Sequence, residues 1–250
     1  MKVLSLFSGG GLGDYGLTLA GMEIVGQVEI DDYCQKILKL RWPDVPKWTD
    51  IRDVKTTELP KCDLISGGFP CQDISVANTK GKGLDGERSG LWSDFYRIFS
   101  DLRPRYALIE NSSNLIIRGL GRLLCDLTKI GYDCEWHCIP ASYIGANHGR
   151  DRIWIVAYSQ CVGQQSRPII REGIKNRRAY GDSYNGSKVC DRPSDHWAIE
   201  PGVGRVAYGI TKRMDRIKAL GNGQVPQVVE WIGKQIMEFD LTNQPHKGRD

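Results

Sequence analysis

The sequence contains no CxxC pair, no internal repeat and no apolar run of the about 18 residues that a membrane span requires. Its first residues, MKVLSLFSGGGLG, hold one lysine and a short apolar run that ends at glycines, so we expect no signal peptide. These absences argue against a membrane protein and against a disulfide scaffold. With 40% hydrophobic and 26% charged residues, the composition is that of a cytoplasmic globular protein.

The 8 cysteines are therefore expected to be reduced thiols. Cys134, His137 and Cys138 lie close together in YDCEWHCI and raise the alternative of a zinc site. The ligand spacing typical of structural zinc sites is missing, so we expect no bound metal.

The net charge of +4 is mildly basic, which permits a polyanionic partner without requiring one. Basic residues gather between Arg167 and Arg192, where few acids occur. This stretch predicts a local basic patch.

Short apolar runs alternate with longer helical patterns over the first 157 residues. The runs predict strands at 3–7, 23–30, 62–69 and 106–111, and the patterns predict helices at 31–42, 91–102 and 120–130. This alternation predicts an α/β fold with a parallel, doubly wound sheet. Two further strands, at 133–139 and 152–159, could form an antiparallel hairpin at the sheet edge.

Changes in residue composition along the sequence divide the chain into four parts. We expect a core over residues 1–158, a small, irregular and basic lobe over 159–205, a return to the core with a C-terminal helix over 206–240, and a disordered tail over 241–250.

A glycine-rich loop, FSGGGLGDYGL, follows the first predicted strand and contains GxGxxG from Gly11 to Gly16. Glycines there let backbone N–H groups approach a ligand at a helix N-terminus. Glu29 ends the second strand, where a carboxylate suits a ribose diol. A dinucleotide, S-adenosylmethionine or no ligand at all would fit this loop. Asp14 would repel a pyrophosphate, which favours a sulfonium cofactor without phosphate.

The stretch GGFPCQDIS places Cys71 after a predicted strand, at the sheet edge where doubly wound folds bind ligands. Pro70 fixes the backbone before it, and the polar, glycine-bearing segment after it has the composition of a mobile lid. Glu110 ends another strand at the same edge, and Arg150 and Arg152 are alternate residues on one side of the last strand. Each residue alone has an inert structural alternative. Together, a thiolate, a carboxylic acid and two guanidiniums suit nucleophilic addition to an electron-poor heterocycle.

These motifs resemble the cytosine carbon-5 DNA methyltransferase family over residues 1–158 and 205–237. The matching stretches are FSGGGLG, VEIDD, TDI, GGFPCQ, IENS, HGRDR and GNGQVPQ. The resemblance implies a Rossmann-like sheet of the S-adenosylmethionine-dependent methyltransferases, with the lobe at 159–205 as its target-recognition region. It also implies methyl transfer from S-adenosylmethionine to carbon 5 of a cytosine flipped out of duplex DNA.

The resemblance assigns catalytic roles residue by residue. Cys71 would add to carbon 6 of cytosine while Glu110 holds or donates a proton at ring nitrogen 3. Arg152 would contact the cytosine carbonyl oxygen, and Arg150 the site backbone or the cysteine region. Asn111 would anchor the loop that carries Pro70.

The resemblance also assigns residues to the two substrates. The cofactor set is Phe7, Ser8, Gly9, Gly11, Leu12, Glu29, Ile30, Asp50, Ile51, Pro70, Asn222 and Val225. The DNA set is Gln72, Ser75, Arg88, Arg177 and Arg178.

The sequence departs from the family pattern in three places. Ser112 follows Asn111 where valine is usual, and His148 stands where glutamine is usual. The recognition region is short, so the basic lobe either reads a very short target or only holds phosphates.

Several alternatives stay open at the level of sequence. An RNA cytosine carbon-5 methyltransferase and a catalytically silent nucleic-acid-binding relic would share this core. We expect a monomer, and the sequence fits both a cognate restriction nuclease and none.

Overall fold

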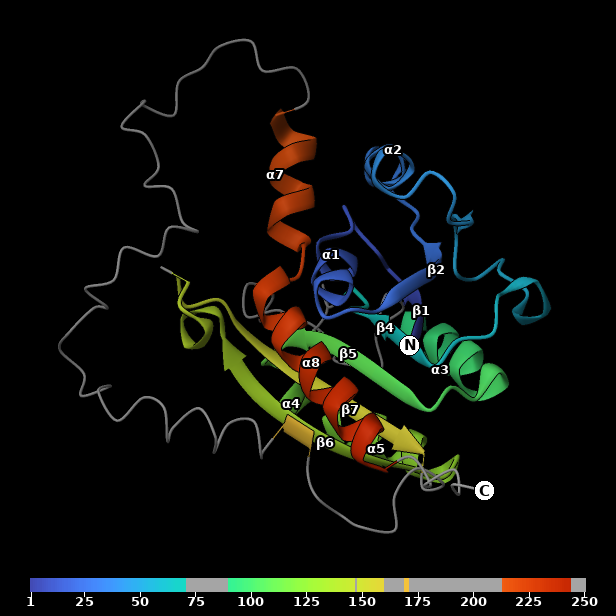
Figure 1. Ribbon diagram of the computed structural model, residues 1–250, viewed down its shortest axis with the longest axis vertical. Coiled ribbons are helices and arrows are strands. Elements are labelled where there is room, and N and C mark those ends of the chain that lie inside the picture. Colours follow the sequence, from blue (N-terminus) through green and yellow to red (C-terminus); the bar gives the residue numbers. More distant parts are fainter. Residues whose placement is uncertain (71–89, 147, 160–168, 171–212, 244–250) are drawn as a thin grey trace, which may run out of the picture.

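The computed structural model describes residues 1–70, 90–146, 148–159, 169–170 and 213–243. Its centre is a seven-stranded sheet of order β3-β2-β1-β4-β5-β7-β6 (Figure 1). The strands are β1 (Lys2–Leu6), β2 (Glu23–Val28), β3 (Lys47–Trp48), β4 (Leu64–Gly67), β5 (Tyr106–Ser112), β6 (Tyr132–Pro140) and β7 (Asp151–Ser159). The helices are α1 (Leu12–Leu19), α2 (Asp32–Arg41), α3 (Leu91–Leu102), α4 (Leu115–Arg118), α5 (Leu120–Lys129), α7 (Arg213–Asn222) and α8 (Pro226–Asn243), with short 3₁₀ turns η1 (Thr56–Glu58) and η4 (Ala141–Ile144).

Strands β1 to β5 run parallel, and β7 lies antiparallel between β5 and β6. The connection from β6 to β7 contains only η4, which is too short for the crossover that a parallel pair needs. The predicted α/β fold and the edge hairpin are thus confirmed. The strand order reverses between β1 and β4, and doubly wound sheets bind ligands at the carboxyl ends of the strands beside such a point.

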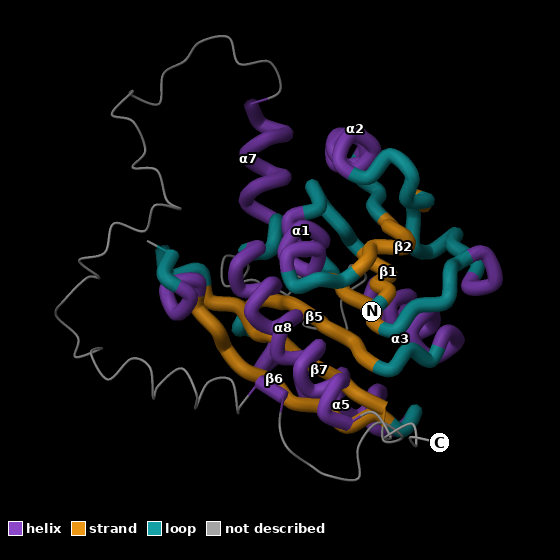
Figure 2. Tube along the Cα trace, viewed as in Figure 1, coloured by secondary structure: helices purple, strands orange, loops and turns teal. Residues whose placement is uncertain are grey.

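Alternate residues of each strand face opposite sides of the sheet, and helices cover both sides (Figure 2). Leu4 and Ile109 belong to the core under α3 and α5. Val3 and Leu108 belong to the core under α1 and α8. The side chains of α3 that enter the core follow helical spacing, which is why this helix lies flat on the sheet.

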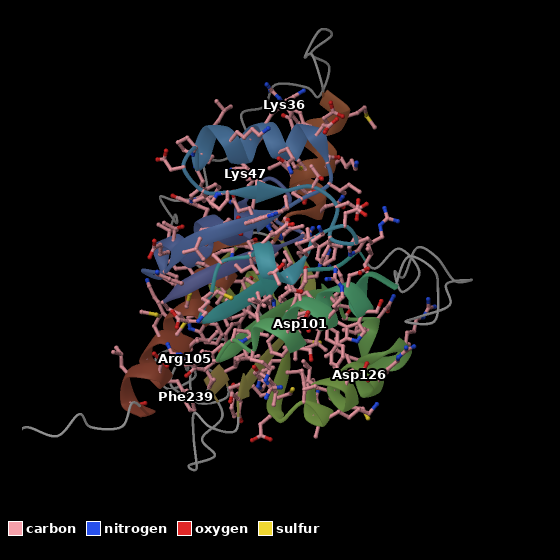
Figure 3. The ribbon with its side chains drawn as sticks, turned by 90° about the vertical axis from the view of Figure 1, so that its right-hand side faces the viewer. Lys36, Lys47, Asp101, Arg105, Asp126 and Phe239 are labelled. Carbon is pink, nitrogen blue, oxygen red and sulfur yellow. The ribbon has the colours of Figure 1, made fainter. Side chains whose placement is uncertain are left out.

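Helix α8 joins the sheet late in the chain, and small residues let it approach α1. A Cβ atom at Gly16 would lie 2.4 Å from the carbonyl oxygen of Pro226, and one at Gly233 would lie 2.9 Å from Cβ of Ala20. At the other end of α8, Asp240 accepts hydrogen bonds from Arg105 and from the Tyr106 hydroxyl. Figure 3 labels Arg105 near Phe239 of this helix.

The structure corrects several predicted boundaries. Helix α8 extends to Asn243, so residues 241–243 belong to this helix and not to the tail that was predicted to be disordered. Strand β3 and the start of α7 at Arg213 were not predicted. Most of the predicted lobe lies outside the described residues. In the described part of it, Ile169 and Ile170 are buried, and Ile170 N–H donates to Glu135 Oε1 at 2.9 Å.

None of the helices in the described ranges has the length and apolar character that crossing a membrane requires.

Candidate active site

A pocket opens at the carboxyl ends of β1, β4 and β5, where the strand order reverses, with an empty volume of about 360 Å³. It is closed by the connection between α7 and α8. The described lining residues are Ser5, Leu6, Phe7, Ser8, Gly9, Gly13, Asp14, Ser66, Gly67, Gly68, Glu110, Asn222, Gly223 and Gln224.

The loop after β1 turns back sharply through left-handed backbone conformations. Phe7 has φ 56°, and Gly9 and Gly11 have φ 55° and 78°. Gly11 is required twice over, because a Cβ atom there would also lie 2.5 Å from Cζ3 of Trp42. The turn places the N-terminus of α1 against the pocket, where its first N–H groups can meet a ligand.

Glu29 holds this loop from behind. Its Oε2 accepts from Gly9 N–H at 2.6 Å, and its Oε1 accepts from Asp31 N–H at 2.8 Å. Burial raises the pKa of the Glu29 carboxyl, and the backbone hydrogen bonds from Asp31 and Gly9 oppose that rise. Glu29 thus lies beside the pocket but not among its described lining residues.

Asp14 is the second carboxylate beside the glycine loop, at the part of the pocket that we call the donor end. It lies in the first turn of α1, and its side chain turns inward to β1 and β2 rather than out of the loop. Its Oδ1 accepts from the Ser5 hydroxyl at 2.5 Å and its Oδ2 from Gln27 Nε2 at 2.6 Å. The side chain is 2% exposed, and burial raises the pKa of Asp14 from 3.8 to about 6 despite these hydrogen bonds.

Glu110 forms the opposite end of the pocket, near the end of β5. Its Oε1 lies 2.9 Å from Arg152 Nε on the neighbouring strand β7. Burial raises the pKa of Glu110, and the charges of Arg152 and Arg150 oppose the rise. A Cβ atom at Gly68 would lie 2.7 Å from Glu110 Oε2, so only glycine leaves room for this acid.

Arg150 makes different contacts from those of Arg152. Its two terminal nitrogens donate to the carbonyl oxygens of Gly221 and Gly223, each at 2.8 Å. These bonds tie the start of β7 to the connection between α7 and α8. Arg150 thus contacts main-chain atoms beside the pocket, and these bonds hold Asn222 and Gln224 there. The Gln224 side chain packs over α1, because a Cβ atom at Gly13 would lie 2.0 Å from its Oε1.

The chain that leads to the expected nucleophile is anchored from β5. Asn111 Nδ2 donates to the Phe69 carbonyl oxygen at 3.2 Å, which confirms the expected anchor beside Pro70. The Phe69 ring packs at 5.7 Å from the Trp92 ring of α3. Cys71 itself, with Gln72, Ser75, Arg88, Arg177 and Arg178, lies outside the described residues.

The structure brings together part of the predicted site. Phe7, Ser8, Gly9, Glu110 and Asn222 line one pocket although they are far apart in sequence.

Other predicted cofactor residues lie elsewhere in the described chain. The Asp50 carboxylate is engaged by Arg52, with Nη2 to Oδ2 at 2.5 Å. Ile51 is buried in the core, whereas Ile30 is 61% exposed. Leu12 packs under Gly223, and Val225 packs in the core beside α8. Pro70 is exposed and does not line the pocket.

Sequence reasoning missed several residues that line the pocket. Ser5 and Ser66 are polar positions inside apolar strands, a signal that points to the ends of buried strands near a site. Gln224 lies in the matching stretch GNGQVPQ, but it was not assigned to the site.

The pocket chemistry suits a cationic ligand without phosphate. Asp14 and Glu110 are the charged residues among its described lining residues, and both are acids. Serine hydroxyls, backbone amides and the side-chain amides of Asn222 and Gln224 supply the remaining polar groups. This set fits the sulfonium and amino-acid end of S-adenosylmethionine.

The strand order and the position of the pocket define the α/β fold of the S-adenosylmethionine-dependent methyltransferases. A family model described as C-5 cytosine-specific DNA methylase matches residues 1–196. The chain belongs to this family of C-5 cytosine-specific DNA methylases.

Two relatives and a solved structure illustrate the similarity. The chain is 34% identical over 165 residues to the type II methyltransferase M2.BsuMI of Bacillus subtilis strain 168, a match that covers 63% of this chain and 42% of that protein. It is 28% identical over 249 residues to the orphan methyltransferase M.Rho11sI of Bacillus phage rho11s, covering 94% and 48%. The match thus spans less than half the length of either relative. A DNMT2 mutant from Spodoptera frugiperda shares the fold, with TM-score 0.56 and 21% identity over 67% of this chain and 53% of that one.

Proposed function

We propose that this protein is a DNA (cytosine-5-)-methyltransferase that transfers a methyl group from S-adenosylmethionine to carbon 5 of cytosine in duplex DNA. One observation carries the proposal. In a chain of this family, a buried Glu110 lies 2.9 Å from Arg152 at one end of a pocket whose other end is a glycine loop backed by carboxylates.

Glu110 and Arg152 form the base-binding end. Because burial raises its pKa, Glu110 holds a proton more readily than an exposed glutamate, and a protonated carboxyl can share that proton with ring nitrogen 3 of cytosine. Arg152 places a positive charge beside the acid, with its Nε atom 2.9 Å from Oε1. Its guanidinium can also donate to the carbonyl oxygen of the ring.

Cys71 supplies the nucleophile in this proposal. Its thiolate forms a bond to carbon 6, and the electron pair of the 5,6 double bond becomes available at carbon 5, while Glu110 keeps nitrogen 3 protonated. S-Adenosylmethionine, when bound, supplies the methyl group as an electrophile. A base then removes the proton on carbon 5, the double bond re-forms and the thiolate leaves.

Duplex DNA is the partner in this proposal. The cytosine has to leave the stack to reach Glu110, at a cost of a few kcal/mol. Gln72, Ser75 and Arg88 remain predicted contacts of the segment after Cys71, and Arg177 and Arg178 of the basic lobe. We place the enzyme in the cytoplasm and expect it to act as a monomer, with or without a companion nuclease.

Base-resolution bisulfite sequencing tests the proposal. Unmethylated duplex DNA is incubated with S-adenosylmethionine and the wild-type protein, Cys71→Ser, or Cys125→Ser as a matched control at an exposed cysteine of α5. We expect methylated cytosines with the wild type and with Cys125→Ser and none with Cys71→Ser. Methylation confined to one short motif would identify the target. Absence of methylation by a wild-type protein that binds S-adenosylmethionine would contradict the DNA reading and direct the same assay to RNA.

A further inference from the structure

Two acidic residues belong to the described lining of the pocket, Asp14 and Glu110, and their negative charges are compensated to different extents. Glu110 has Arg152 at 2.9 Å, and the charge of Arg150 acts on it as well. Asp14 accepts its hydrogen bonds from two neutral groups, the Ser5 hydroxyl and the Gln27 amide. Asp14 therefore places a negative charge at the donor end that its hydrogen-bond partners do not neutralise.

The nearest charged groups do not change this imbalance. Lys47 of β3 acts on Asp14 only at a distance, because its Nζ donates to the carbonyl oxygens of Trp42 and Val45. Glu29, behind the glycine loop, adds negative charge on the same side. The described residues at the donor end of the pocket therefore carry more negative than positive charge.

The Asp14 carboxylate is also held in one position beside the pocket. Its side chain is 2% exposed, and both of its oxygens are held, one by β1 and one by β2. A carboxylate in this position acts as a fixed charge, and a fixed charge in a partly buried site acts on a ligand far more strongly than a mobile surface charge does.

We propose that Asp14 makes the donor pocket selective for positive charge, so that it holds the cationic methyl donor in preference to the neutral by-product. The inference rests on the proposed function, since it concerns the ligand of the same pocket. It assigns a specificity role to a residue of α1 that is hydrogen-bonded to β1 and β2 and lines the pocket.

The reaction removes the positive charge of the ligand, and the selectivity acts on this change of charge. When carbon 5 of cytosine forms its bond to the methyl carbon, the electron pair of the methyl–sulfur bond stays on sulfur. The sulfonium thereby becomes a neutral thioether, S-adenosylhomocysteine. The attraction of Asp14 for the sulfur centre is lost at that moment, and release of the by-product becomes easier.

Calorimetric titration of the whole chain with three ligands tests the inference without any catalytic turnover. The ligands are S-adenosylmethionine, its neutral by-product S-adenosylhomocysteine, and sinefungin, which carries an ammonium group in place of the sulfonium. The proteins are the wild type, Asp14→Asn, and Asp32→Asn, which removes the same charge from an exposed position on α2. Thermal denaturation checks that each variant is folded.

We expect Asp14→Asn to weaken both cationic ligands about tenfold and to change the affinity for S-adenosylhomocysteine less than twofold. Asp32→Asn should bind all three ligands as the wild type does. Equal weakening of all three in Asp14→Asn would overturn the inference in favour of a purely structural role, and so would no weakening of any. A wild-type protein that binds none of the three would instead refute the proposed function.

Discussion

Replacing Asp14 by asparagine should make the protein more stable at neutral pH. The pKa of this carboxyl rises from 3.8 to about 6 on folding, with burial as the largest cause. Because the folded-state pKa is the higher one, the contribution of Asp14 to stability is fully present below pH 3.8 and is lost as the pH rises through about 6. Each unit corresponds to about 1.4 kcal/mol, so the ionised carboxylate costs about 3 kcal/mol of unfolding free energy at pH 7.5.

Asparagine keeps the hydrogen bonds without the charge. Its amide oxygen can accept from the Ser5 hydroxyl. Its N–H group can donate to Gln27 Oε1, which is buried without a hydrogen-bond partner among the described residues, once the Gln27 amide turns over. The substitution should therefore relieve the buried charge without adding to the unpartnered polar atoms of the described residues, because Gln27 Nε2 takes the place that its unpartnered Oε1 leaves.

Urea denaturation of the wild type and Asp14→Asn at several pH values measures this effect. The variant should be more stable by about 1–3 kcal/mol at pH 7.5, and the difference should shrink towards zero near pH 4. A variant that is less stable by the same amount at both pH values would refute the reasoning. It would mean that the carboxylate geometry, rather than the burial of its charge, decides the stability of this site.

Three further substitutions test other contacts. Gly16→Ala should lower the unfolding free energy by about 1–3 kcal/mol in urea denaturation, because its Cβ atom would lie 2.4 Å from the Pro226 carbonyl oxygen. Gly121→Ala is the control, since its Cβ atom would meet nothing within 4 Å; a similar loss there would contradict the packing argument. Arg150→Met should weaken S-adenosylmethionine binding about tenfold in calorimetry, because it frees the connection between α7 and α8; unchanged affinity would show that these contacts do not shape the pocket. Glu110→Gln should lower the rate of methyl transfer by about 10²-fold or more in a radiolabelled-methyl assay while cofactor affinity changes less than twofold, and a variant of wild-type rate would remove the acid from the mechanism.

The sequence predicted those parts of the fold that depend on local pattern. The strands β4 and β5 could be predicted because a strand buried on both faces forms a continuous apolar run, and α3 could be predicted because a helix that packs on one side repeats its apolar residues with a period of 3.6. Strand β3 has two residues and leaves no such period. The tail was misjudged because its polar composition hides the last turn of α8.

Residues of the candidate site could be predicted from the sequence where a residue type serves one kind of chemistry. Glu110 and Arg152 were both expected at the site from their positions at strand ends, and the structure places them 2.9 Å apart, a pairing that the sequence did not predict. The individual partners of Arg150, the carbonyl oxygens of Gly221 and Gly223, could not be predicted, because every residue carries a main-chain carbonyl group. Asp14 was placed in an open loop because the sequence does not show that helix α1 begins at Leu12.

The late arrival of α8 has a consequence for synthesis on the ribosome. The first strands and Glu110 emerge early, but the sheet face under α1 and α8 stays uncovered until Val228, Val229, Ile232 and Ile236 have been added. Asn222 and Gln224, which close the donor pocket, also belong to this last stretch. A nascent chain therefore carries Glu110 well before the pocket around it is complete, so the site forms only when translation has passed α8.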